Sequence, residues 1–132
     1  MEERVRSFLE HHHSAVMATI KPDGRPHLVR IGCGLVEGKL WSSATQTRAR
    51  TGHLRRDPRA TLFLWDERNA WSWLTLECTV TILDGPEAVD QNLALYRVLA
   101  GEPKDLQEYR EAMVTERRLI YEFEVERAYG QA

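Results

Sequence analysis

The segment K-P-D-G-R-P at residues 21–26 constrains the fold most, because it encodes a tight turn between two β-rich stretches. Proline fixes one negative φ, and Asp-Gly supplies the positive φ values that a tight hairpin requires. Residues 14–20 before the turn are rich in β-forming types, and residues 27–36 make the return strand. The sequence therefore predicts an antiparallel hairpin in the first third of the chain.

Strand patterns continue through most of the chain. Gly32 and Gly34 inside the return strand predict a bulge or a place where another group approaches the backbone closely. In residues 71–83, apolar and polar side chains alternate strictly, which directs one face to the core and the other to water. The predicted strands span residues 14–20, 27–36, 39–43, 60–65, 71–83 and 119–125.

Four segments have a helical pattern instead: residues 3–11, residues 47–57, a helix opened by Pro86, and residues 104–114. In the second, Thr47 is the expected cap and Ala49, His53 and Leu54 are expected to face inward. In the third, Val89, Leu93 and Tyr96 share a face. Six strands with interspersed helices predict a mainly β protein, a small antiparallel barrel in one domain over residues 1–132.

Composition excludes several classes of function. With 42% hydrophobic and 29% charged residues the chain is globular, and its net charge of -2 provides no broad attraction for a nucleic-acid backbone. The longest uncharged apolar run, residues 14–20, is far shorter than the ~20 residues of a membrane helix. The charged N-terminus does not resemble a secretory leader, so we expect a soluble cytoplasmic protein.

The segment W-S-S-A-T-Q-T-R-A-R at residues 41–50 carries the clearest chemistry. It delivers four hydroxyl groups to a helix N-terminus, those of Ser42, Ser43, Thr45 and Thr47. Free backbone N–H groups and the helix dipole favour an anion there, and Arg48 and Arg50 add forked donors suited to phosphate. Two interpretations stay open from spacing alone: a phosphate cradle, or a capped helix with solvated arginines.

Trp71 and Trp73 flank Ser72, so both indoles share a face of the predicted strand. Such a pair can form a wall against a flat ring system, although paired aromatics at a strand start are more often part of the core. His27 has the same two interpretations. It is a candidate proton donor, but the more common role is that of a buried histidine with its hydrogen bonds satisfied.

Other reactive residues give weaker indications. Three adjacent histidines, His11 to His13, point in different directions, so they do not converge on one metal ion, and no metal site is predicted. Cys33 and Cys78 lack metal-ligand spacing and an adjacent basic residue, which disfavours nucleophilic catalysis. The basic run at residues 55–59 is interpreted as a solvated helix face rather than as a nucleic-acid patch.

Several longer segments together resemble one known family. They are A-T-I-K-P-D-G-R-P-H-L-V (18–29), R-A-R with L-R-R-D-P-R (48–59), W-S-W-L-T-L-E (71–77), A-L-Y-R-V-L-A-G-E (94–102) and Y-R-E-A-M-V-T-E-R-R (109–118). They resemble the pyridoxamine-phosphate-oxidase-like split-barrel superfamily. Within it they are most similar to the flavin/deazaflavin oxidoreductases that depend on coenzyme F420. The match covers nearly the whole chain.

The resemblance implies a six-stranded antiparallel split β-barrel and a homodimer with two cofactor sites at the subunit interface. It implies hydride transfer between reduced F420 and a small organic substrate. The strand formed by Trp41, Ser42 and Ser43 would line the ring system with its backbone, and Arg48 and Arg50 would bind the phosphate together with Thr45, Thr47 and Ala49. Trp71 would flank the ring or the tail of the cofactor.

The family usually has lysine at the position of Arg50, which keeps the charge but changes the geometry. The arginine-rich helix would also attract the oligoglutamate tail of F420. Three alternatives remain: an oxidoreductase of the same fold that uses FMN, a non-catalytic carrier of the cofactor or of haem, and a nucleic-acid binder. A true pyridoxamine phosphate oxidase is disfavoured, because little chain follows the last predicted strand.

Overall fold

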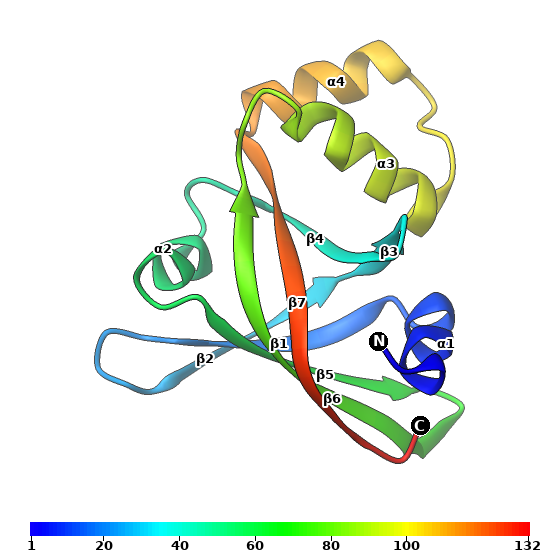
Figure 1. Cartoon of the computed structure of the whole chain (residues 1–132). Helices are drawn as coiled ribbons and strands as arrows, with labels where there is room; N and C mark the ends of the chain where they lie inside the picture. Colours follow the sequence, from blue (N-terminus) through cyan, green and yellow to red (C-terminus); the bar gives the residue numbers. More distant parts are fainter.

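Two long strands, β6 (Asn69–Leu83) and β7 (Arg118–Gly130), form the centre of one curled sheet. They pair antiparallel from Leu74 opposite Gly130 to Leu83 opposite Ile120. The strand order is β2-β1-β5-β6-β7-β4-β3, and every neighbouring pair is antiparallel. The two edge strands are β2 and β3. The sheet curls into a half-closed barrel, with α3 and α4 over one end and α1 at the other (Figure 1).

The computed structural model describes all of residues 1–132. The remaining elements are α1 (Glu3–His11), β1 (Ser14–Ile20), β2 (Pro26–Gly32), β3 (Gly34–Val36), β4 (Lys39–Thr45), α2 (Ala49–Arg56), β5 (Arg59–Asp66), α3 (Ala88–Ala100) and α4 (Leu106–Thr115). No helix is both long enough and apolar enough to cross a membrane.

The prediction of six strands is wrong by one, because the return strand predicted over residues 27–36 divides at Cys33. The backbone N–H of Cys33 donates to the carbonyl of His13 at 2.8 Å, and β2 and β3 lie on either side of it. The close approach predicted at the glycines is found at Gly34. A Cβ there would lie 3.2 Å from side-chain atoms of Val98 and Leu99 on α3, so a side chain would crowd the helix.

The predicted hairpin is confirmed, with β1 and β2 paired from Ser14–Gly32 to Ile20–Pro26. Only Gly24 in its turn has a positive φ, of 86°, so the expectation that Asp23 would share that conformation is wrong. Asp23 instead accepts a hydrogen bond from the backbone N–H of Arg25 at 2.9 Å. Gly24 donates to the carbonyl of Lys21 at 2.9 Å, which is the pattern of a turn followed by a glycine bulge.

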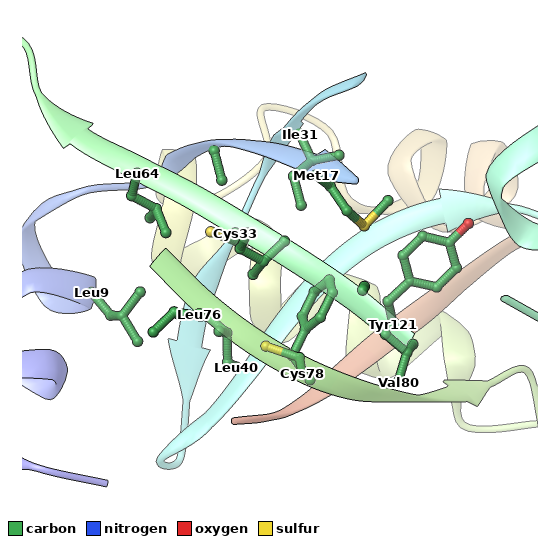
Figure 2. Close-up of a cluster of buried hydrophobic side chains, with 14 of the residues drawn as sticks. Leu9, Met17, Ile31, Cys33, Leu40, Leu64, Leu76, Cys78, Val80 and Tyr121 are labelled. Atoms are coloured by element: carbon green, nitrogen blue, oxygen red, sulfur yellow. The ribbon is translucent and has the colours of Figure 1, made fainter. Parts of the chain in front are cut away.

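One cluster of 20 buried residues fills the barrel. Figure 2 shows Leu9 of α1 at one end of this cluster and Tyr121 of β7 at the other. A separate small cluster of Trp41, Leu95 and Ile120 lies between α3 and the sheet. The alternation predicted for β6 is confirmed for Leu74, Leu76, Cys78 and Val80, which are buried, but Thr75, expected to face water, is buried as well.

The helix starts and faces differ in detail from the prediction. Arg48, not Thr47, is the N-cap of α2, and no side chain caps it; Ala49 is exposed although it was expected to face inward. In α3, Leu93 is buried as expected, but Tyr96 is exposed and Leu95 takes the buried position. Helical periodicity alone does not show which side of a short helix meets the sheet.

Two glycines give a matched test of these local conformations. Gly52 lies exposed within α2 and has free space around a would-be Cβ, so Gly52→Ala should raise the free energy of unfolding by about 0.5–1 kcal/mol. Gly24 has equal space but a φ of +86°, so Gly24→Ala should lower it by roughly 1–2 kcal/mol. Urea unfolding of the two variants measures both. Equal effects of the two substitutions would contradict the assigned backbone conformations.

Candidate functional site

The junction between β4 and α2 is fixed by the start of β7. Thr45, the last residue of β4, lies opposite Arg118, and the backbone N–H of Gln46 donates to the carbonyl of Arg117 at 3.1 Å. β3 pairs with β4 only as far as Trp41, so beyond that residue β4 has a strand partner on its β7 side alone. The end of β4 therefore keeps one backbone edge free of strand pairing where it enters the helix.

A buried hydroxyl pair anchors the first turn of α2 to the core. The Thr51 hydroxyl donates to the carbonyl of Thr45 at 2.8 Å and also hydrogen-bonds the hydroxyl of Tyr121. Burial raises the pKa of Tyr121, and the hydrogen bond to Thr51 opposes that rise. Because Thr51 and Tyr121 are both fully buried, the position of the helix start is coupled to core packing.

A hollow of about 620 Å³ lies beside this helix start. Its lining residues are Thr45, Thr47, Arg48, Ala49, Thr115, Glu116, Arg117 and Arg118. Three arginines against one glutamate leave an excess of two positive charges in the lining. Arg118 pairs with Glu116 at 2.9 Å, whereas Arg48 and Arg117 have no carboxylate within ion-pair distance.

Arg50 lies half-buried behind this hollow, and its Nε–H is buried without a hydrogen-bond partner. The pKa of Arg50 is lowered, chiefly by burial, and the positive charges of Arg48 and Arg118 lower it further; the neighbouring Tyr121 opposes this. Like charges held together and a buried donor left unpaired are both unfavourable without an anion. A bound anion would relieve the crowding of positive charge.

The structure thus brings Thr45, Thr47, Arg48 and Ala49 together around one hollow, with Arg50 behind it. The side chains of Trp41 and Ser42 are engaged elsewhere. The Trp41 indole donates to Glu122 at 2.9 Å and packs against Leu95, and the Ser42 hydroxyl donates to the carbonyl of Gly32 at 2.6 Å.

Ser43 faces a different space. Its hydroxyl donates to the Oδ1 of Asn92, and it lines a second hollow between β4 and the two C-terminal helices. Of the three residues predicted to line a ring system, only Ser43 therefore presents its side chain to a hollow. The other two can contribute backbone alone.

Sequence reasoning missed four residues that line the hollow: Thr115, Glu116, Arg117 and Arg118. They are separated from Arg48 by about half the chain, and only the pairing of β4 with β7 brings them to the hollow. Arg117 has a φ of 54°, the left-handed conformation, and its N–H donates to the carbonyl of Val114 at 3.1 Å at the end of α4. The two consecutive arginines before a predicted strand were the available indication.

Trp71 lies away from the hollow. It is 81% exposed at the far end of β6, roughly 40 Å along the strand from Leu83 at ~3.3 Å per residue. The interpretation of Trp71 as a core residue is therefore wrong, and one chain alone does not bring it to the arginines. Trp73 is half-buried, with its ring 5.7 Å from that of Phe63 and 6.4 Å from that of Tyr129.

His27 also lies outside the arginine-lined hollow. Its ring centroid is 5.0 Å from that of His53 on α2, and the Nδ1 of His27 is buried without a partner, so the expectation of a satisfied histidine is wrong. The Nδ1 of His53 hydrogen-bonds Thr19 Oγ1 at 3.0 Å. Burial lowers the pKa of His53, and the neighbouring His27, Arg56 and Lys21 lower it further.

The other histidines and the basic run have local partners. The rings of His11, His12 and His13 hydrogen-bond three different backbone carbonyls, which confirms that they diverge. In the basic run, Arg55 pairs with Asp84 at 2.9 Å and Arg59 with Asp57 at 2.8 Å. This pairing leaves the run less available to an external polyanion.

A half-closed antiparallel barrel with helices at its ends is the architecture of a split-barrel protein. The model of the pyridoxamine 5'-phosphate oxidase family matches residues 1–132, so the chain belongs to this family. The resemblance seen in the sequence is confirmed at the level of the family.

Solved structures agree with this fold. A conserved hypothetical protein from Mycobacterium tuberculosis superposes with a TM-score of 0.81 at 23% identity, over 97% of this chain and 82% of that one. An F420 reductase superposes with a TM-score of 0.78 at 19% identity, over 98% of each chain. HutZ, the haem storage protein from Vibrio cholerae, gives a TM-score of 0.74 at 13% identity, over 98% and 94% of the two chains.

Arg117 allows backbone strain to be separated from charge. Arg117→Ala and Arg117→Gly remove the same charge, but only glycine relaxes the left-handed φ, so the glycine variant should be more stable than the alanine variant by about 1 kcal/mol. Chemical denaturation of the two variants gives the difference directly. If the alanine variant were the more stable, the turn at the start of β7 would not have the conformation described.

Proposed function

We propose that this protein binds coenzyme F420 at the arginine-lined hollow and catalyses hydride transfer between the reduced cofactor and a small organic substrate. The observation that carries the proposal is the convergence of Arg48, Arg117 and Arg118 around hydroxyl groups, with Arg50 close to Arg48 and no carboxylate paired to Arg48 or Arg117. The similarity to an F420 reductase over 98% of each chain supports the cofactor class.

The residues present fit a phosphate. Arginine presents forked donors that match phosphate oxygens, and the buried Nε–H of Arg50 supplies a donor that nothing in the chain satisfies. The Thr45 and Thr47 hydroxyls, 3.3 Å apart, can donate to the same anion, and the start of α2 favours negative charge. Arg48, Arg50, Arg117 and the two threonines would therefore hold the phosphate.

The unpaired backbone edge of β4 supports a ring system beside that phosphate. From Ser42 onward β4 lacks a strand partner on one side, so a flat ligand can lie along its backbone. F420 supplies hydride chemistry when bound, and the protein contributes position and exclusion of water. Neither His27 nor any other histidine lines the hollow, and Glu116 is paired with Arg118, so we propose that water supplies the proton.

FMN is the first alternative, because it also carries a phosphate and the hollow selects for the phosphate. The expected attraction of the oligoglutamate tail of F420 to the helix loses support, since Arg55 and Arg59 are paired with aspartates. Arg48, Arg56 and Arg117 are the exposed arginines of this region without a carboxylate partner. The two cofactors are distinguished by titrating the purified protein with each.

A carrier of haem is a second candidate, because HutZ, a haem storage protein, has the same fold over 98% of this chain. Neither large hollow is lined by a histidine, the residue that most often ligates haem iron in binding proteins. The geometry therefore favours a phosphate-bearing cofactor over haem.

We further propose that two copies assemble through an aromatic surface on β5, β6 and β7. The rings of Phe63, Trp65, Trp73 and Tyr129 form a continuous series with neighbouring centroids 5.7–6.4 Å apart, and Trp71 extends it into solvent. These side chains point away from the barrel core, which is filled by Leu62, Leu64, Leu74 and Leu76 from the same strands. Exposed aromatic groups of this kind are typical of interface anchors.

Removing the arginines should weaken cofactor binding. Each of Arg48→Ala and Arg50→Ala should raise the dissociation constant for F420 at least tenfold, about 1.4 kcal/mol, because each removes charge-assisted hydrogen bonds to the phosphate. Fluorescence titration measures the change. Arg25→Ala removes the same charge from the β1–β2 turn and serves as the control. Unchanged affinity in both site variants would refute the proposed function.

The dimer has its own test. Trp71→Asp should convert a dimer to a monomer, because it places a charge among the interface aromatics; analytical ultracentrifugation gives the mass of each species. Leu106→Asp is the control, since Leu106 is an exposed apolar residue on α4, outside the aromatic surface. A wild-type protein that sediments as a 15.3 kDa monomer would end the proposal of a dimer.

A further inference from the structure

We infer that the second hollow, enclosed by α3, α4 and the β4–β7 edge, binds an uncharged planar organic molecule. Its assignment as the substrate site rests on the proposed function, but binding itself does not. The hollow has a volume of about 700 Å³, within the range of about 300–1,000 Å³ typical of small-molecule sites. It shares Glu116 and Arg118 with the arginine-lined hollow, the phosphate hollow of the proposed function.

Helix α4, which covers this hollow, is held to α3 by polar contacts. None of the ten residues of α4 is buried. The Tyr109 hydroxyl donates to the carbonyl of Asn92 at 3.0 Å, and the Arg110–Asp90 ion pair at 2.8 Å adds a second connection to α3. The Tyr96 and Tyr109 rings lie 4.9 Å apart. The hydrogen bond and the ion pair to α3 therefore hold α4 in place, while the apolar side chains of α4 face the hollow or solvent rather than the core.

The floor of the hollow has its polar groups satisfied within the chain. Asn92 is buried; its Oδ1 accepts from the Ser43 hydroxyl, and its Nδ2 donates to the carbonyls of Ala88 at 2.9 Å and Leu119 at 3.5 Å. No buried donor or acceptor in this hollow lacks a hydrogen-bond partner. A molecule bound at the floor therefore needs few polar atoms, whereas a ligand of the unpaired Arg50 Nε–H needs a hydrogen-bond acceptor.

The walls favour a flat apolar shape. Leu95, Tyr96 and Leu99 come from α3, and Ala112 and Met113 come from α4. Aromatic rings stack on flat ligands, and the flexible thioether of methionine adapts to irregular ones. These residues belong to the segments 94–102 and 109–118, which contribute to the family resemblance of the sequence. Of these two segments, only residues 115–118 line the phosphate hollow.

Charge separates the two hollows. The lining here has two basic residues, Lys104 and Arg118, against three acidic ones, Asp105, Glu108 and Glu116. Arg118 is already paired with Glu116, and Asp105 caps α4 by accepting the backbone N–H of Glu108 at 3.0 Å. Without a positive excess the site has no means to compensate an anion, so the ligand it suits is uncharged.

The two hollows adjoin each other, which makes this site suitable for a substrate. Glu116 and Arg118 line both of them. A molecule under α4 and an anion at the start of α2 would therefore lie on two sides of one ion pair. Ser43, on the floor, comes from the same strand that leads to the phosphate hollow.

Equilibrium dialysis of the purified full chain with menadione, an uncharged bicyclic quinone, tests the inference. 2-Naphthoate, of similar size but anionic, is the comparison ligand, and we expect it to bind at least tenfold more weakly. Met113→Trp fills the hollow and should weaken menadione binding at least tenfold. Val114→Trp makes the same change at the adjacent residue, which is 66% exposed and outside the lining, and should leave affinity within twofold.

A second variant, Tyr96→Ala, keeps the test valid if Met113→Trp does not fold. Tyr96→Ala removes an exposed wall residue rather than adding bulk, and it should also weaken menadione binding at least tenfold. Both cysteines are buried, so addition of the quinone to a thiol does not imitate binding. Absence of menadione binding, equal binding of 2-naphthoate, or unchanged binding in both Met113→Trp and Tyr96→Ala would overturn the inference.

Titrating the same variants with F420 separates this inference from the proposed function. Loss of F420 affinity in Met113→Trp as large as the loss of menadione affinity would show that the hollow holds the cofactor ring, and would overturn a separate substrate site. If menadione still binds while Arg48→Ala and Arg50→Ala both leave F420 affinity unchanged, the proposed function is refuted and this site stands.

Discussion

The contact between Tyr121 and Thr51 is the interaction on which the geometry of the candidate site depends. Tyr121 lies in the core on β7, and Thr51 lies in the first turn of α2 and also donates to the carbonyl of Thr45 on β4. The consecutive elements β4 and α2 are thereby joined to β7, which is distant in sequence, at one buried pair of hydroxyls. Since a buried hydroxyl is costly to leave unpaired, the arginines at the start of α2 are held in a place that core packing defines.

The sheet register completes that arrangement from the other side. β7 pairs with β6 along most of its length and with β4 at its start, so Arg118 is placed opposite Thr45 and Arg117 closes the hollow. The left-handed backbone of Arg117 fits this account, because a residue held in a strained conformation persists where its surroundings determine it. The hollow is thus formed by two strand ends that no local sequence pattern links.

The sequence predicted what depends on near neighbours. The β1–β2 hairpin followed from its turn residues, and β6 followed from strict alternation of side chains. The division of β2 from β3 was not predictable, because it depends on the bond from Cys33 to His13 and on α3 crossing over Gly34. For the same reason the sequence identified Arg48 and Arg50 as anion-binding candidates but not Arg117, whose proximity to them is a product of strand pairing.

Local pairing of charges explains how a chain with a net charge of -2 can offer a site for an anion and not a surface for a polyanion. The arginines that follow the candidate site on α2 and β5 are largely neutralised, Arg55 by Asp84 and Arg59 by Asp57. Arg48 and Arg117 stay unpaired at one concave place, and Arg50 is desolvated behind them. A small anion in the hollow would meet Arg48 and Arg117, and Arg50 adds its charge from beside Arg48, whereas an extended anion would meet paired side chains. The selectivity then comes from where carboxylates are placed, since the arginines themselves do not distinguish one phosphate from another.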